Sequence, residues 1–148
     1  LDRARKLGLP VVAPDEIYDV ECDIFSPCAL GGVINPDTIP RITARVIAGG
    51  ANNQLLTEAD GEELHRRGVL YAPDYLINAG GIINVSAEIG TPYSADRARE
   101  KTERIYEIMS RVIQVSKKEE ISIAKAADRI AEQRLASVRA IKTIYRSR

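Results

Sequence analysis

Short apolar runs separated by polar loops shape residues 1–90 of the chain. Runs of strand length occupy residues 9–13, 22–25, 45–48 and 69–72, and Pro or Gly follows each within two positions. Between them, residues 14–18 favour a short helical turn. A longer helix begins at a capping box formed by Thr57 and Asp60 and ends at Gly68. Strands that alternate with helical segments predict an α/β fold with a parallel sheet and right-handed crossovers.

From residue 82 onward, apolar residues recur at helical spacing over longer segments. Residues 82–89 continue a helix that Gly90 ends, and the segment from Gly90 to Ser94 is the expected hinge. Two long helices are predicted, over about residues 94–118 and 122–145. Their apolar stripes are Ala98, Ile105, Ile108, Met109, Val112 and Val115 in the first, and Ile123, Ala127, Ile130, Val138, Ile141 and Tyr145 in the second. These spacings predict an antiparallel helix pair that closes over a core.

The chain starts with Leu1 rather than Met, and residues 1–8 have the pattern of the end of an amphipathic helix that stops at Gly8. We therefore expect the chain to begin partway through a larger protein.

Three loops after the predicted strands carry the functional signal. They are residues 26–32, 49–54 and 77–81, and each contains a pair of glycines. The C-terminal ends of parallel strands meet at one edge of a sheet, where open α/β sheets bind ligands. Glycine pairs there allow backbone N–H groups to approach a ligand closely. Any one pair alone is more typical of an ordinary turn or helix start, and it is the three pairs at three strand ends that favour a binding role. The pattern favours a cleft for a cofactor and a small polar substrate.

Asparagines are the candidate binding residues in these loops. Asn52, Asn53 and Asn78 offer uncharged donors and acceptors, which suit a carboxamide, a ribose hydroxyl or a substrate carboxylate. Asparagine after a strand is also a common turn residue, so both interpretations stay open. Cys28 lies in the first loop, but the single histidine, His65, falls on the polar side of a predicted helix. We therefore expect Cys28 to pack beside a ligand rather than act as a nucleophile, and His65 to be solvated.

Charge and composition exclude several classes of partner. Lysine plus arginine and aspartate plus glutamate both number 21, so the formal net charge is zero. Nothing therefore indicates nucleic acid or an anionic membrane surface. No apolar run reaches the roughly 18–20 residues that a membrane span needs. The spacing of Cys22 and Cys28 suits neither a metal site nor a disulfide framework, so we expect reduced thiols, no metal and a cytoplasmic location.

Two kinds of residue are missing near the loops. No glycine-rich G-x-G-x-x-G motif follows a strand, so the loop that binds the phosphates of a dinucleotide is not in this chain. All the lysines fall on predicted helices, and none lies near the three loops. A reaction that needs a buried amine must take it from elsewhere.

Four segments of the sequence, in the same order along the chain, resemble one known protein family. Residues 22–32, 46–54, 71–85 and 126–132 resemble the C-terminal part of the glutamate/leucine/phenylalanine/valine dehydrogenase family, and its leucine-specific members most closely. This resemblance implies the second half of an NAD-binding Rossmann-like domain over residues 1–90, with a partial parallel sheet. It implies a C-terminal helical segment over residues 91–148 that packs on that domain.

The resemblance also implies an activity and its site. The family deaminates an L-amino acid oxidatively, with NAD as hydride acceptor, and its full-length members form homo-oligomers. By position, Pro27, Cys28 and Ala29 match the loop beside the cofactor ribose. Ala51 and Asn52 match the nicotinamide side, with Asn78 nearby. The substrate-binding positions are Asn53, for the carboxylate, and Ile82 and Val85, for the side-chain pocket.

An aliphatic pocket wall favours a branched side chain over a second carboxylate, whose burial without a cation is costly. We therefore expect leucine, valine or isoleucine as substrate rather than glutamate. The family's catalytic lysine, its partner aspartate and its glycine-rich motif lie before the part that this chain matches. The isolated chain is accordingly expected to show no turnover.

Two other interpretations stay open. The chain is also consistent with a non-catalytic α/β remnant that self-associates through an exposed sheet edge. A weaker alternative is an unrelated nucleotide-binding α/β domain, such as a methyltransferase-like one.

Overall fold

A parallel three-stranded sheet lies at the centre of the fold. The structure is a computed structural model that describes residues 1–90 and 92–146, and the side chains of the last helix as far as residue 141. The strands of the sheet are β1 (Ile24–Phe25), β2 (Val46–Ile47) and β3 (Leu70–Tyr71). They are arranged in the order β1-β2-β3, so each strand pairs with the next along the chain. The α/β class and the parallel sheet are confirmed, and the C-terminal ends of all three strands lie at one edge.

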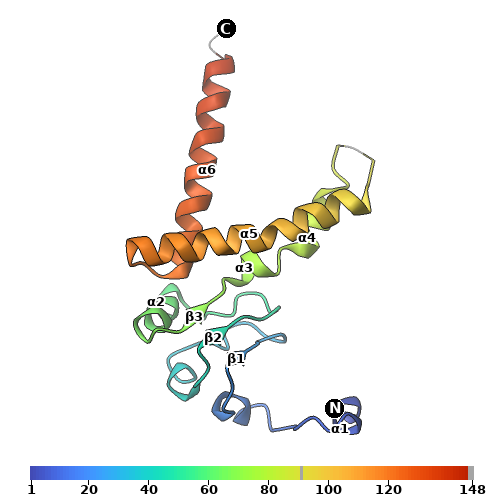
Figure 1. The fold of residues 1–148 in the computed structure, drawn as a ribbon, viewed down its shortest axis with the longest axis vertical. Helices are drawn as coiled ribbons and strands as arrows, with labels where there is room; N and C mark the ends of the chain where they lie inside the picture. The colour runs from blue at the N-terminus through green and yellow to red at the C-terminus, as the bar shows by residue number, and fades with distance from the viewer. Residues whose placement is uncertain (91, 147–148) are drawn as a thin grey trace.

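Helices cover the sheet and extend beyond it. They are α1 (Asp2–Lys6), α2 (Glu58–Arg66), α3 (Asp74–Ile77), α4 (Gly80–Ser86), α5 (Ala95–Glu119) and α6 (Ile123–Arg146), with 3-10 turns η1 (Glu16–Asp19) and η2 (Ile39–Arg41). The predicted capping box at Thr57 is present, because the Thr57 N–H donates to Asp60 at 2.7 Å. Figure 1 shows α5 crossing above the sheet, with α3 and α4 next to it and α1 at the opposite end of the molecule.

Two apolar clusters hold the described part of the chain together. The larger one joins the sheet to α2 and to the connection between β1 and β2, through Ile34, Ile39, Ile42, Ala44, Ile47, Leu64 and Tyr71. Full burial of a large aliphatic side chain contributes about 1.5–3 kcal/mol, so this cluster carries most of the stability of the sheet. The smaller cluster joins α5 to the start of α6 through Val112, Ala126 and Ala127.

The predicted strand at residues 9–13 is wrong. This segment has no regular structure, and Leu9 is 55% exposed. Pro10 and Pro14 remove two backbone donors, and β1 pairs with β2 alone among the described strands. Without a neighbour to pair with, an apolar run of this length does not form a strand.

The predicted antiparallel pair of long helices is also wrong. Both helices form close to the expected bounds, but Figure 1 shows α6 leaving α5 at a steep angle and extending away from the body. Their contact is confined to the turn between them and the first turns of α6, where Ala126 and Ala127 are buried. Farther along the predicted stripe, Val138 and Ile141 are exposed. The side chain of Tyr145 lies outside the described residues. Periodicity therefore identified the helix, but not a partner for its C-terminal half.

Among residues 1–90 and 92–146, no helix is both long and apolar enough to cross a bilayer.

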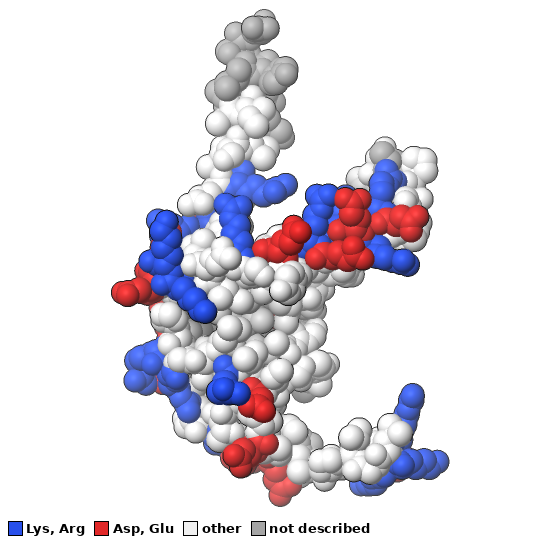
Figure 2. All heavy atoms as spheres, in the orientation of Figure 1, with Lys and Arg blue, Asp and Glu red and all other residues white. Residues whose placement is uncertain are grey.

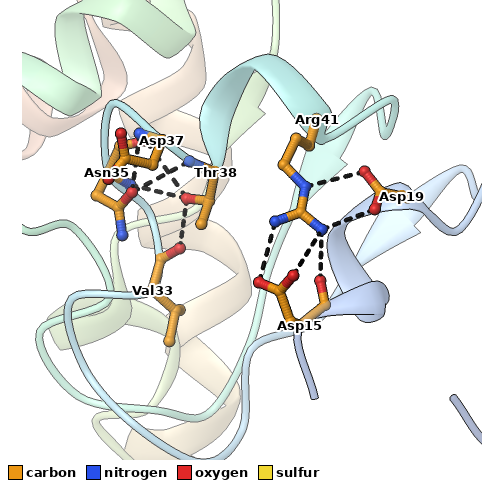
Figure 3. A network of polar contacts seen from close by, with 7 residues as sticks. All are labelled: Asp15, Asp19, Val33, Asn35, Asp37, Thr38 and Arg41. Atoms are coloured by element: carbon orange, nitrogen blue, oxygen red, sulfur yellow. Dashed lines mark hydrogen bonds and ion pairs between the residues drawn. The ribbon is translucent and has the colours of Figure 1, made fainter. Parts of the chain in front are cut away.

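One arginine holds the N-terminal segment against the body (Figure 3). The Arg41 guanidinium donates to both carboxylate oxygens of Asp19, at 2.9 and 2.7 Å, and to the carboxylate and the backbone carbonyl of Asp15. It also lies 5.3 Å from the centroid of the Tyr18 ring. This bonding lowers the pKa of the Asp19 carboxyl, so the ion pair persists down to acidic pH. Beside it, Thr38 and Asn35 close the turn that presents Arg41, with the Thr38 hydroxyl donating to the Val33 carbonyl at 2.7 Å.

Replacing Arg41 by Lys should release the segment before β1, because an ammonium cannot make the same paired bonds to two carboxylates. Limited proteolysis should then cut residues 8–20 several-fold faster than in the unsubstituted chain. An Arg45→Lys variant is the matched control, since Arg45 pairs with the single carboxylate of Asp23 and both side chains are exposed. Equal cleavage rates in the two variants would contradict the role assigned to Arg41.

Candidate functional site

The first two of the predicted loops touch backbone to backbone. A β-carbon at Gly49 would overlap the carbonyl oxygen of Pro27, and Gly49 is buried. The Ala51 N–H donates to that same carbonyl at 2.9 Å. Only glycine allows this approach, so Gly49 is required by packing between the loops.

Asn53 ties all three strand ends together through its backbone. Its N–H donates to Oδ2 of Asp74 at 2.6 Å, and its carbonyl accepts from the Gly32 N–H at 2.7 Å. Asn53 is left-handed, with φ of 52°, which asparagine tolerates better than most residues. Gly31 also packs closely against the second loop, because a β-carbon there would be 2.8 Å from the Asn52 carbonyl oxygen. Asn53, which the family resemblance matches to the residue for the substrate carboxylate, is therefore held through both its backbone N–H and its carbonyl.

The other two asparagines bind each other. Nδ2 of Asn78 donates to Oδ1 of Asn52 at 2.6 Å, which joins the second loop to the turn between α3 and α4. The predicted third loop is mostly helical, because Ile77 ends α3 and Gly80 and Gly81 begin α4. The bond between the two asparagines uses one Asn52 acceptor and one Asn78 donor. The Asn52 amide nitrogen and the Asn78 amide oxygen are then the groups that this pair can offer to a ligand.

The thiol of Cys28 lies at the same edge and is exposed. The Gly50 N–H, 3.4 Å from Sγ, lowers the pKa of Cys28, and the Ser26 hydroxyl at 3.4 Å lowers it further. His65 is exposed on α2, as expected. None of the bonds of Cys28 in the described part of the chain involves a histidine, so the thiol has no activating base there. The described residues also contain no group of three metal-ligating side chains.

Sequence reasoning missed two buried polar residues at the site. Gln54 is fully buried, and its Nε2 donates to the carbonyls of Gly49 and Ala51 at 2.6 and 2.9 Å. Asp74, at the start of α3, accepts from Asn53 and from the Tyr71 hydroxyl. The leucines that follow Gln54 give no signal that its side chain points inward, since Leu56 is 60% exposed. Nothing in the sequence around Asp74 distinguishes it from an ordinary acidic residue in a first helical turn.

The remaining predicted residues lie on either side of this junction. Pro27 and Ala51 are buried and Ala29 is exposed, all within the first two loops. Ile82 and Val85 lie three positions apart on α4, on one helix face, and they are 72% and 59% exposed. Neither takes part in the bonds that join the loops. The structure therefore brings together the loop residues and leaves the two aliphatic residues on an adjacent open surface.

The groups that this edge offers to a ligand are polar and uncharged. The groups that the loops present are amides, backbone N–H groups and one thiol. In the view of Figure 2, the described lysines, arginines, aspartates and glutamates gather at the periphery, and the surface over the sheet is mostly free of them. Such an edge can bind a carboxamide, a ribose or a single carboxylate through hydrogen bonds.

Comparison with known proteins places this arrangement in one enzyme family. Residues 4–142 match the model of the glutamate/leucine/phenylalanine/valine dehydrogenases, and the chain belongs to that family. Its characterised relatives are amino acid dehydrogenases, which are oxidoreductases.

Individual relatives agree in sequence and in structure. The chain is 49% identical over 141 residues to the leucine dehydrogenase of Bacillus cereus, which covers 95% of this chain and 38% of that protein. It superposes on the crystal structure of L-tryptophan dehydrogenase from Nostoc punctiforme with a TM-score of 0.86 and 42% identity, covering 94% of this chain and 42% of the other. A hetero-hexameric glutamate dehydrogenase from Thermus thermophilus shares the fold, with a TM-score of 0.68 at 24% identity, covering 90% of this chain and 34% of the other. The chain thus spans less than half the length of each.

Replacing Gly49 by Ala should separate the first two loops, since the new methyl group meets the Pro27 backbone and neither side can yield easily. We expect the free energy of unfolding to fall by about 3 kcal/mol, the upper end of the usual cost of overpacking. The measurement is urea denaturation followed by circular dichroism.

The matched control is Gly81→Ala. Nothing lies within 4 Å of a β-carbon at Gly81, which is inside α4. That substitution should leave stability unchanged or raise it by up to about 1 kcal/mol through helix propensity. A Gly49→Ala variant as stable as Gly81→Ala would refute the close-packing argument.

Proposed function

We propose that this chain provides one side of the active site of an NAD-dependent dehydrogenase that deaminates branched-chain L-amino acids oxidatively. The observation that carries the proposal is the junction at Asn53 of the first two loops with α3, beside the bond from Asn78 to Asn52, which together collect uncharged hydrogen-bonding groups at one sheet edge. Family membership supports the reaction class. The catalytic amine and the phosphate-binding loop come from outside these 148 residues, as the sequence indicates.

The cofactor has a suitable set of contacts at this edge. NAD supplies the hydride acceptor when bound. In the proposal, Pro27, Cys28 and Ala29 lie beside its ribose, and Ala51 and Asn52 lie on its nicotinamide side. The bond from Asn78 fixes the Asn52 side chain, so its amide N–H groups are held ready for a carbonyl oxygen.

Asn53 is proposed to hold the substrate carboxylate. Its side chain is exposed while its backbone is bonded on both sides, so it can bind a ligand without loss of the loop structure. Amide donors to the carboxylate orient the α-carbon toward the cofactor. Orientation of this kind contributes several kcal/mol, and up to about 7–11 kcal/mol in the best intramolecular cases.

Side-chain preference is assigned to Ile82 and Val85. Both are apolar and open to solvent on α4, so a branched aliphatic side chain gains by covering them. A glutamate side chain would lose hydration there without finding a cation. Leucine, valine and isoleucine are the proposed substrates.

A chimera tests this function directly. In it, the present chain replaces the segment of the Bacillus cereus leucine dehydrogenase to which it is 49% identical. We expect the chimera to form NADH with L-leucine, with kcat/KM at least about 100-fold higher than with L-glutamate, whose second carboxylate is costly to bury. The isolated chain should form none.

An Asn53→Asp substitution in the chimera tests the carboxylate contact. It keeps a residue type that tolerates the left-handed backbone but places two negative charges together, so kcat/KM for leucine should fall about 100-fold. Asn84→Asp, at an exposed asparagine on α4, is the matched control and should change little. A folded chimera without leucine-dependent turnover, or an active isolated chain, would overturn the proposal.

A second candidate function is self-association of the chain without catalysis. It is favoured by Ile24, which is 60% exposed on the open side of β1, and by the exposed Val138 and Ile141 on α6. An open sheet edge with an exposed apolar side chain can pair with a second copy.

Light scattering at micromolar concentration separates the two candidates. Edge pairing predicts a dimer or larger species that Ile24→Lys converts to a monomer, whereas Val12→Lys, an exposed apolar position before β1, should not. A monomer without any substitution would exclude edge pairing.

A further inference from the structure

We infer that Asp74 and Tyr71 are positioning residues that fix the backbone of Asn53, and through it the direction in which Asn53 presents its amide to the substrate carboxylate. The inference rests on the proposed function for the identity of that ligand. The bonds themselves do not depend on it.

The Asp74 carboxylate joins two elements that follow β2 and β3. Its Oδ2 accepts from the Asn53 N–H at 2.6 Å, and its Oδ1 accepts from the Tyr71 hydroxyl at 2.9 Å. Asp74 is 8% exposed and Tyr71 is 4% exposed, so both bonds are shielded from water. A hydrogen bond to a buried charged acceptor is stronger than one at the surface.

Both groups that donate to Asp74, the Asn53 N–H and the Tyr71 hydroxyl, keep their protons at neutral pH. Burial raises the pKa of Tyr71 and the neighbouring Asp74 carboxylate raises it further, so the phenol keeps its proton at neutral pH. Asp74 is the first residue of α3, but its side chain makes none of the capping bonds of that short helix. The carboxylate is therefore committed to Asn53 and Tyr71.

Asn53 needs such a support because of its conformation. With φ of 52°, it occupies a region that costs free energy for a residue other than glycine, and the surroundings must hold it there. The Gly32 N–H bonds its carbonyl on one side, and Asp74 bonds its N–H on the other. Loss of the Asp74 bond frees the peptide to rotate, and the Asn53 side chain turns with it.

The substitution Asp74→Asn tests this support with little change in size. A neutral amide can keep its oxygen on the Asn53 N–H only by turning its N–H₂ to the Tyr71 hydroxyl, which must then accept, so the Asn53 bond loses its charged acceptor and weakens. Tyr71→Phe is a milder second variant, because it removes one donor and keeps the Asp74 bond to Asn53. Tyr75→Phe is the matched control: its hydroxyl bonds Asp128, outside this set.

Amide hydrogen exchange of the 148-residue chain, read by NMR, gives the first result. We expect the Asn53 amide to exchange at least tenfold faster in Asp74→Asn, about threefold faster in Tyr71→Phe, and at an unchanged rate in Tyr75→Phe. The amides of Ile47 and Ala72 distinguish this local opening from global unfolding, because they should keep their protection from exchange in all three variants. Unchanged exchange at Asn53 in both Asp74→Asn and Tyr71→Phe would overturn the inference.

Steady-state kinetics of the same variants in the chimera give the second result. Misdirection of Asn53 should raise KM for L-leucine about tenfold and leave KM for NAD within twofold, whereas general loosening of the site would move both. Equal effects on the two constants would overturn the positioning role. If the chimera lacks turnover altogether, the proposed function fails, and the exchange rates still decide whether Asp74 holds Asn53. If Asp74→Asn does not fold, Tyr71→Phe decides in both assays.

Discussion

Contact between the backbones of Gly49 and Pro27 is the constraint on which the rest of the site depends. Because no β-carbon fits between them, the loops after β1 and β2 are held at the closest separation that peptide groups allow. The bond from Ala51 to Pro27 and the bond from Gly32 to Asn53 follow from this separation. The segment after β3 then reaches the same place through Asp74, at the start of α3, and Asn78, in the turn between α3 and α4. One steric condition thus brings three distant parts of the chain to a single edge.

Buried polar groups, rather than apolar packing, shape the loops at that edge. Gln54 is directed inward and bonds two carbonyls of its own loop, while its neighbours Asn52 and Asn53 stay exposed. Asp74 performs the corresponding task for the segment after β3. Nε2 of Gln54 and the Asp74 carboxylate stabilise the loops because their bonds compensate for lost hydration, so these positions tolerate little change. Oε1 of Gln54 is buried without a hydrogen-bond partner among the described residues. The exposed amides remain available for binding because the structural bonds are made elsewhere.

The sequence predicted features whose cause is local, and missed those whose cause lies elsewhere in the chain. The capping box at Thr57 and the strands that end at glycine or proline were predicted correctly, since neighbouring residues decide them. The meeting of the strand ends at one edge was predicted from the alternation of strands and helices, which implies a parallel sheet. The run at residues 9–13 had the right composition for a strand but no described partner, and α6 had an apolar stripe on which Val138 and Ile141 are exposed. The roles of Gln54 and Asp74 depend on atoms about 20 residues or more away, or on a side chain's direction, which no spacing rule reveals.

Sequential strand order has a consequence for how the chain acquires its structure. Each strand pairs with the one that follows it, so each pairing closes a connection of roughly 20 residues rather than a longer loop. A ribosome releases β1 and β2 well before α5 is made, so the strand pairs can form in the order of synthesis. The edge that gathers the amides can then form before the long helices are available to pack on the sheet.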